Sequence, residues 1–214
     1  IINRIKKNKV EIIAYGSGNI GTLIKTIKNF DKEIFLIKSK SDFNKCHKIV
    51  LPGVGSFGIA IGFLEKKRLF YHLKKYILNG GETLGICLGM QILYNSSEEA
   101  KEYKGLGIIK RKIKKISLKD KIQISIPHIG WNKVLVKKQP KEKIDKIVVN
   151  RKFYFSHSFA DQITRDSSCP SFNYGANIYC SIIKYRNLIA SQFHPELSGK
   201  VGQEIFNLFL NNNS

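Results

Sequence analysis

Short apolar segments alternate with helix-spaced segments through the first half of the chain, and this alternation limits the folds that it can adopt. The predicted strands are residues 10–15, 33–37, 48–51 and 83–86. The predicted helices are 20–30, 57–64 and 70–78, with a further helix that begins at Leu88. Strands that alternate with helices form a mostly parallel sheet. We therefore predict an α/β fold with a mostly parallel central sheet and helices on both faces.

The second half is richer in strands, and we expect it to add antiparallel strands to this fold. Its predicted strands are 112–118, 133–136, 153–156, 178–183 and 188–192. A final helix is predicted over 201–210, a polar loop over 137–146 and a frayed tail over 211–214. Since no repeat or long linker divides the chain, residues 1–214 are predicted to form a single domain, with 1–8 as a basic N-terminal extension.

The chain is strongly basic, with 37 Lys and Arg against 16 Asp and Glu and a net charge of +21. A basic surface is typical of proteins that bind nucleic acid or anionic membranes. Six of the cations are arginine, however, and the lysines are spread over the whole sequence without interleaved aromatic residues. We interpret the charge as compositional drift on solvated faces, with a functional charge as the alternative. No apolar run reaches the roughly 18 residues of a membrane helix. We expect no nucleic-acid or membrane partner.

The cysteines are widely spaced and form no CxxC pair; they are Cys46, Cys87, Cys169 and Cys180. This spacing argues against a zinc site of the usual kind and against a disulfide scaffold. We expect a reducing, cytoplasmic location, no metal, and at least two cysteines that act as small buried hydrophobic residues.

Cys87 lies in the segment Gly85-Ile86-Cys87-Leu88-Gly89, a G-x-C-x-G pattern between a predicted strand and a predicted helix. A nucleophile on such a sharp turn needs neighbours without side chains, so that backbone segments can approach closely. A helix N-terminus also favours the thiolate, which is the reactive form. The segment predicts a cysteine nucleophile, and the alternative is a buried cysteine between two packing glycines.

His194 and Glu196 follow the last predicted strand and are two residues apart. In extended chain, residues two apart point to the same face. The carboxylate could then orient the imidazole, while the other ring nitrogen takes the proton of the thiol. An exposed loop histidine is the commoner explanation of His194 alone, but the cysteine turn upstream favours a catalytic pair.

Residues 85–91 and 194–196 together resemble the class I, triad-type glutamine amidotransferases. Five further segments stand in order along the chain: YGSGN (15–19), LPGVGSF (51–57), PHIGWN (127–132), FSHSF (155–159) and NYG (173–175). Within the class they resemble the glutaminase subunits of imidazole glycerol phosphate synthase, an enzyme of histidine biosynthesis. The likeness covers residues 9 to 210.

The resemblance implies a role for individual residues. Cys87 would be the nucleophile, His194 the general base and Glu196 the carboxylate that orients it. The residues implied in glutamine binding are Gly53, Gly55, Leu88, Gln91, Glu99, His157 and Ser158. Trp131 and Asn132 would face a partner subunit, although Trp131 alone could equally be ordinary core. The adjoining Glu98 leaves open which of the two glutamates contacts glutamine.

The resemblance also implies a reaction and a partner. The chain would hydrolyse glutamine to glutamate and ammonia without a cofactor. The ammonia would pass through a (β/α)₈-barrel cyclase subunit, bound as a heterodimer, which makes imidazole glycerol phosphate and an aminoimidazole carboxamide ribonucleotide. Ala14, where an Asp is frequent, and Phe159, where a Tyr is usual, depart from the family pattern.

Three alternatives follow from the same residues. The glutaminase of pyridoxal phosphate synthesis shares the cysteine turn, but should lack the segment 127–132. A non-catalytic scaffold would keep the fold and lose the triad, whereas all three triad residues are present. A nucleic-acid-binding module would use the +21 charge, but should show clustered arginines.

Overall fold

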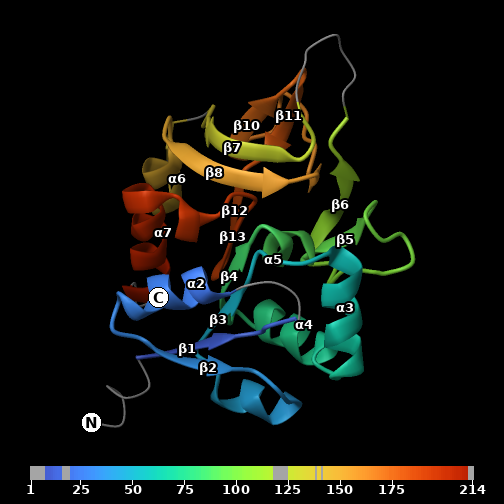
Figure 1. The fold of residues 1–214 in the computed structure, drawn as a ribbon, viewed down its shortest axis with the longest axis vertical. Coiled ribbons are helices and arrows are strands. Elements are labelled where there is room, and N and C mark those ends of the chain that lie inside the picture. Colours follow the sequence, from blue (N-terminus) through green and yellow to red (C-terminus); the bar gives the residue numbers. More distant parts are fainter. Residues whose placement is uncertain (1–7, 16–19, 118–124, 138, 141, 212–214) are drawn as a thin grey trace.

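The centre of the molecule is a six-stranded sheet (Figure 1), seen in a computed structural model that describes residues 8–15, 20–117, 125–137, 139–140 and 142–211. The strand order is β12-β13-β4-β3-β1-β2. The strands are β1 (Lys9–Ile12), β2 (Glu33–Leu36), β3 (Lys48–Leu51), β4 (Glu82–Ile86), β12 (Ile182–Tyr185) and β13 (Leu188–Ser191). Neighbouring strands are parallel except for β12, which is antiparallel to β13. The predicted mostly parallel α/β sheet is confirmed.

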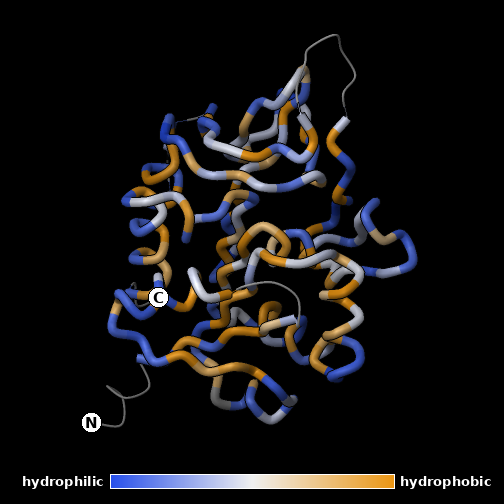
Figure 2. Tube along the Cα trace, viewed as in Figure 1, coloured by the Kyte–Doolittle hydropathy of each residue, from blue (hydrophilic) through white to orange (hydrophobic). Residues whose placement is uncertain are grey.

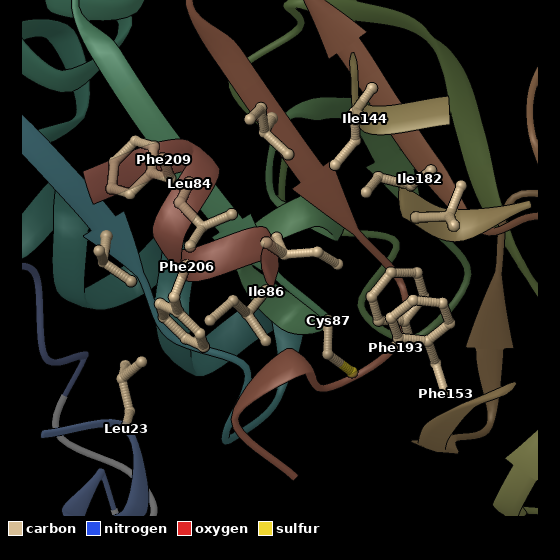
Figure 3. Close-up of a cluster of buried hydrophobic side chains, with 14 of the residues drawn as sticks. Leu23, Leu84, Ile86, Cys87, Ile144, Phe153, Ile182, Phe193, Phe206 and Phe209 are labelled. Carbon is tan, nitrogen blue, oxygen red and sulfur yellow. The ribbon is translucent and has the colours of Figure 1, made fainter. Parts of the chain in front are cut away.

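Helices cover both faces of this sheet because its buried strands carry apolar residues on both sides. Along β3, Val50 belongs to one hydrophobic cluster, whereas Ile49 and Leu51 belong to the other. Helices α2 (Gly21–Lys28) and α7 (Gly199–Asn211) pack on the first face. Figure 3 shows Phe206 and Phe209 of α7 against Leu84 and Ile86 of β4. Helices α3 (Phe57–Lys66) and α4 (Phe70–Leu78) pack on the second face.

Smaller sheets, two of them antiparallel and one mixed, stand beside the central sheet in the described part of the chain. Figure 2 shows that hydrophobic residues concentrate along the inner strands. One pairs β7 (His128–Lys133) with β8 (Lys152–His157), and one pairs β10 (Ser171–Tyr174) with β11 (Asn177–Cys180). A third sheet contains β5 (Tyr94–Ser97), β6 (Ile109–Lys115) and β9 (Phe159–Ala160). Phe153, Phe172 and Tyr179 join the cluster that underlies α7, so the added strands share a core with the central sheet.

Several boundaries differ from the sequence prediction. The strand predicted over 133–136 is β7, which ends at Lys133, because β7 buries His128 and exposes Ile129 and Trp131. This arrangement inverts the usual apolar-inside pattern of a strand. The predicted strand over 178–183 is divided between β11 and β12.

Other elements were absent from the prediction. Helix α6 (Lys143–Val148) replaces the end of the predicted polar loop, because Ile144 and Val148 lie on one buried face and Asp145 completes a capping box with Glu142. Strands β5, β9 and β10 were not predicted either. Residues 1–7 of the predicted extension, 16–19 of the first motif and 212–214 of the predicted tail lie outside the described residues.

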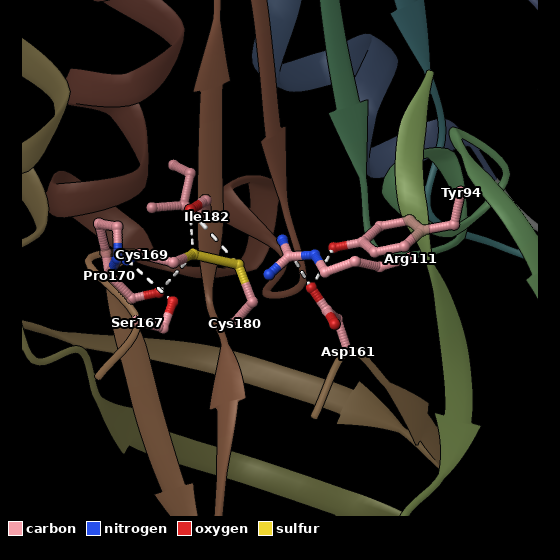
Figure 4. Close-up of a disulfide and its surroundings, with 8 residues drawn as sticks. All are labelled: Tyr94, Arg111, Asp161, Ser167, Cys169, Pro170, Cys180 and Ile182. Atoms are coloured by element: carbon pink, nitrogen blue, oxygen red, sulfur yellow. Dashed lines mark hydrogen bonds and ion pairs between the residues drawn. A yellow bond between two sulfur atoms is a disulfide. The ribbon is translucent and has the colours of Figure 1, made fainter. Parts of the chain in front are cut away.

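A disulfide joins Cys169 to Cys180 (Figure 4). The cysteine spacing had argued against disulfides, and this bridge corrects that expectation. Beside it, buried Asp161 accepts a hydrogen bond from the Tyr94 hydroxyl (2.7 Å) and pairs with Arg111 (2.8 Å). Burial raises the pKa of Asp161, although the Tyr94 hydroxyl and Arg111 oppose this effect. These contacts tie the segment that follows β9 to β5 and β6.

None of the helices in the described part of the chain has the length and apolar character that a membrane crossing requires.

Close backbone contact between α7 and the short 3₁₀ helix η2 (Pro195–Leu197) yields a stability prediction. A Cβ atom at Gly202 would overlap the carbonyl oxygen of Pro195. We expect Gly202→Ala to lower the free energy of unfolding by about 1–3 kcal/mol, because backbone must move to admit the methyl group. Urea denaturation measures the change. The matched control is Gly62→Ala within α3, where an added Cβ meets Tyr103 at an ordinary 3.4 Å. This control should be neutral or stabilising by up to about 1 kcal/mol, and equal effects of the two variants would contradict the prediction.

Candidate active site

Cys87 sits on a strained turn between β4 and the helix α5 (Leu88–Gln91). Its backbone has φ 44° and ψ −100°, a conformation that non-glycine residues rarely adopt. A Cβ at Gly89 would overlap the carbonyl oxygen of Leu51 in β3, and one at Gly85 would lie 2.8 Å from the carbonyl oxygen of Gly89. The two glycines therefore allow the close approach that the G-x-C-x-G pattern predicts.

The helix after Cys87 is shorter than expected. A helix does begin at Leu88, but it has four residues before the chain turns toward β5. So short a helix has little of the macrodipole that the sequence analysis invoked. What remains is the unpaired first turn, in which backbone N–H groups are oriented toward the N-terminal side.

His194 and Glu196 form a buried pair, with 2.8 Å between His194 Nδ1 and Glu196 Oε1. The extended geometry expected for this pair is wrong, because Glu196 lies within η2 while His194 precedes it. The His194 backbone N–H donates to the Tyr154 carbonyl, and Ser198 Oγ donates to the His194 carbonyl. The backbone around the imidazole is thus fixed on both sides.

Gly53 brings the cysteine and the histidine into one place. A Cβ at Gly53 would lie 2.8 Å from His194 Cε1 and 3.0 Å from Cys87 Cβ. Burial of the imidazole opposes its protonation, but the Cys87 thiolate and the Glu196 carboxylate outweigh this effect and raise the pKa of His194 to about 10. At neutral pH this raised pKa favours the protonated imidazolium of His194.

A cavity of about 240 Å³, here called the cysteine cavity, opens beside Cys87. It is lined by all the residues that the resemblance implied in glutamine binding: Gly53, Gly55, Leu88, Gln91, Glu99, His157 and Ser158. Three more lining residues, Pro127, Ser156 and Phe159, were not predicted to contact the substrate. All three lie in motifs that it quoted, so membership of those motifs was the available signal.

The two adjoining glutamates have different surroundings. Glu99 lines the cysteine cavity, and its Oε2 accepts the Phe57 backbone N–H at 3.0 Å. Glu98 Oε2 accepts the Lys115 backbone N–H at 3.0 Å, and Glu98 pairs with Lys112. Glu98 is therefore engaged on β6, and Glu99 is the carboxylate available at the cavity.

His157 lines the cysteine cavity and His128 packs behind it, and neither buried histidine carries charge at neutral pH. Burial lowers the pKa of His157 to about 3 and that of His128 to about 4. His157 Nδ1 lies 3.0 Å from the Phe159 carbonyl, and its Nε2 lies 3.3 Å from His128 Nδ1. A neutral wall leaves Glu99 as a charged group at the cavity that could meet the amino group of an amino acid.

A second cavity of about 400 Å³, here called the outer cavity, lies beside His194 and Glu196. Gly53, Gly55 and Ser156 line both cavities, so the two cavities adjoin at these residues. Glu196 Oε2 is buried and has no hydrogen-bond partner among the described residues.

Exposed apolar side chains lie near the outer cavity. Trp131 is 56% exposed and contacts Tyr154, a lining residue, edge to face; Leu197, another lining residue, is 43% exposed. The interpretation of Trp131 as core is therefore wrong. Asn132 is half-buried and donates to the Asn173 carbonyl at 2.9 Å, so it orders the local backbone.

No group of three His, Cys, Asp or Glu within the described ranges could hold a metal ion.

The charge state of His194 gives a prediction. Cys87→Ser removes the thiolate charge and its hydrogen bond, while burial still opposes protonation. We expect the pKa of His194 to fall from about 10 toward or below its ordinary value of 6.5. NMR titration of the imidazole resonances measures the fall, and Cys46→Ser, at a free cysteine held by Asp42, is the control that should leave the value unchanged. An unshifted pKa in Cys87→Ser would mean that no thiolate faces this imidazole.

Known proteins share this sequence and fold. Residues 10–212 match the family described as glutamine amidotransferase class-I. Imidazole glycerol phosphate synthase subunit HisH of Prochlorococcus marinus subsp. pastoris is 40% identical, over 92% of this chain and 95% of the relative. The HisH subunit of Methanocaldococcus jannaschii is 39% identical, over 94% and 98%. The imidazole glycerol phosphate synthase hisHF of Schizosaccharomyces pombe is 33% identical, over 95% of this chain and 38% of that protein.

Solved structures agree on the fold. The structure of PurLQS from Thermotoga maritima superposes with a TM-score of 0.69 at 17% identity, over 95% of this chain and 97% of that one. A crystal structure of a glutamine amidotransferase gives 0.65 at 15% identity, over 94% and 97%. The chain belongs to the class I glutamine amidotransferases and, among them, to the HisH subunits of imidazole glycerol phosphate synthase.

Proposed function

We propose that this chain hydrolyses glutamine through Cys87, His194 and Glu196 and delivers the ammonia to a cyclase subunit of imidazole glycerol phosphate synthase. The observation that carries the proposal is geometric: Cys87 and His194 meet at Gly53, Glu196 lies 2.8 Å from His194 Nδ1, and Gln91 and Glu99 line the cavity beside Cys87. We propose that the whole chain acts as one domain in this reaction.

The first half-reaction forms a thioester. Cys87 Sγ attacks the side-chain carbonyl carbon of glutamine, and the carbonyl oxygen gains the negative charge. The Leu88 N–H and a peptide N–H of the 53–55 segment would stabilise this oxyanion. The imidazolium of His194 then gives its proton to the leaving nitrogen, the C–N bond breaks, and ammonia departs. A glutamyl thioester and a neutral imidazole remain.

The second half-reaction restores the enzyme. Neutral His194 takes a proton from water, and the hydroxide formed attacks the thioester carbonyl. The C–S bond breaks, glutamate leaves, and the thiolate and imidazolium return. Glu196 stabilises the imidazolium in both halves by its 2.8 Å contact with Nδ1.

The outer cavity is the proposed exit for ammonia. It shares Gly53 and Gly55 with the cysteine cavity, and Glu196 Oε2, which has no hydrogen-bond partner among the described residues, supplies an acceptor beside it. A barrel-type cyclase that covers Trp131 and Leu197 would shield neutral ammonia from protonation in bulk water. Support for a covering partner comes from the exposure of these apolar side chains and from the joint name, hisHF, of the longer yeast relative. A cytoplasmic location stays a prediction from the sequence.

Loss of the nucleophile should separate two activities of the complex. We expect Cys87→Ala to reduce glutamine-dependent product formation on the order of 10⁴-fold or more. Activity with ammonium salt should persist, because free ammonia bypasses the thioester. Steady-state assays with the cyclase and each nitrogen source measure both, with Cys46→Ala as the matched control. Glutamine turnover that survives in Cys87→Ala would overturn the nucleophile assignment.

The partner should activate the glutaminase. An N–H of the 53–55 segment can aim at the oxyanion or away from it, and one oxyanion donor is worth about 10²–10³ in rate. We expect glutamine turnover to rise when cyclase is added, and again with its nucleotide ligand. Equal turnover under all three conditions would contradict gating by the partner.

One glycine offers a variant for this test. Gly55 has φ +106°, which an L-residue rarely adopts. Gly55→Ala should lower the stimulated turnover while binding of the cyclase, measured by calorimetry, persists. Gly62→Ala is the control. Substitution of Gly53 is less informative, because a side chain there would push on His194 directly.

A further inference from the structure

Gln192 is a fully buried polar residue that neither the sequence analysis nor the proposed mechanism uses. It directly follows β13, two residues before His194. Its side-chain Nε2 donates to Cys87 Sγ at 3.5 Å, and its Oε1 accepts from Gln91 Nε2 at 3.1 Å. The side chain thus connects the nucleophile with a residue that lines the cysteine cavity.

A backbone carbonyl sets the direction of this chain of hydrogen bonds. Gln91 Nε2 also donates to the Phe159 carbonyl at 2.8 Å. A carbonyl oxygen can only accept, so the Gln91 amide must present its nitrogen to Phe159. The second hydrogen on that nitrogen then requires an acceptor in Gln192, which is its Oε1. The amide nitrogen of Gln192 is therefore left facing Cys87.

The same logic fixes what Gln91 offers to a ligand. Both hydrogens of its amide nitrogen are donated within the protein, to Phe159 and Gln192. The carbonyl oxygen is the end of Gln91 that remains for a molecule in the cysteine cavity. A hydrogen-bond acceptor there, together with the Glu99 carboxylate, suits the amino group of an amino acid.

The Phe159 carbonyl is itself held in place. Phe159 is in β9, where it pairs with Lys115 of β6, and the Tyr94–Asp161–Arg111 contacts tie the chain two residues further on. Lys115 is held in turn by Glu98. The Phe159 carbonyl, which accepts from Gln91, is thus held within the β6–β9 sheet.

We propose that Gln192 is a positioning residue of the glutaminase reaction: its amide N–H holds the Cys87 thiolate, and its carbonyl oxygen fixes Gln91 with an acceptor toward the substrate amino group. The inference rests on the proposed function for the identity of the substrate. The thiolate contact does not depend on that identity. A hydrogen bond to the charged form of a group favours that form, so loss of the N–H should lower the fraction of reactive thiolate.

The test uses Gln192→Met, which conserves volume and removes the donor and the acceptor together. Alkylation of Cys87 by iodoacetamide is measured in a Cys46→Ser background. We expect the rate at neutral pH to fall about tenfold or more, the size of effect that a hydrogen bond to a charged group gives, and the midpoint of the rate profile to move to higher pH. With the cyclase present, KM for glutamine should rise and kcat should fall. Gln203→Met, at an exposed glutamine on α7, is the control.

The outcomes separate the inference from the proposed function. An alkylation rate and pH profile equal to those of the control would overturn the role of Gln192, whatever the enzyme does with glutamine. A wild-type complex that does not hydrolyse glutamine would overturn the proposed function instead, while the alkylation result would still decide the thiolate contact.

A measurement without substitution of Gln192 covers the case in which Gln192→Met fails to fold. The side-chain amide resonances of Gln192 are followed by ¹⁵N NMR in the wild-type chain, in Cys87→Ser and in Cys46→Ser. We expect them to shift in Cys87→Ser alone, because that variant removes the acceptor. Resonances that do not move would contradict the contact.

Discussion

The close approach of β4, α5 and β3 around Cys87 is the constraint on which the rest of the site depends. No side chain fits at Gly89, which meets the Leu51 backbone carbonyl, and a side chain at Gly53 would press on the side chains of Cys87 and His194. The chain can then turn through a conformation that costs about 1–3 kcal/mol at a non-glycine residue. Burial of β3 and β4 between helices offsets this strain, because all four residues of β3 are buried. The sheet thus holds the Cys87 thiol beside the His194 imidazole.

The sequence predicted features that depend on residues close together in the chain, and it missed features that depend on distant residues. Strand β3 and helix α4 have the predicted bounds, since their apolar spacing and flanking turns lie within a few residues. The cysteine turn and the cavity residues followed from short motifs. Strand β7 was misplaced because Trp131 is exposed on a surface that we assign to a partner, and a single chain cannot reveal this. The Gln192–Cys87 contact was missed because it joins residues 105 positions apart.

Electrostatics within the site depend on which groups lose their charge on burial. His128 and His157 are buried among rings such as Phe155 and Phe172 and become neutral. His194 is also buried, yet it gains the charges of Cys87 and Glu196 and becomes cationic. Three histidines in one small region therefore have opposite charge states for a physical reason: only one of them lies between two anions. This difference confines the proton needed in the proposed reaction to the nitrogen that faces the thiolate.

The 53–55 segment is the element that the two cavities share, because Gly53 and Gly55 line both. In the proposed function, the substrate carbonyl and the leaving ammonia lie on opposite sides of one peptide layer. Large side chains at positions 53 and 55 would keep the oxyanion away from the backbone N–H groups in the cysteine cavity. They would also keep ammonia away from Glu196 in the outer cavity. Glycine at 53 and 55 makes the layer thin, and it also allows a peptide to rotate. Trp131 packs on Tyr154, and Tyr154 lines the outer cavity together with Gly53 and Gly55. A partner that contacts Trp131 is therefore separated from the 53–55 segment by a single side chain, that of Tyr154. Coupling between the partner and the thiol therefore requires only local movement, with no rearrangement of the sheet.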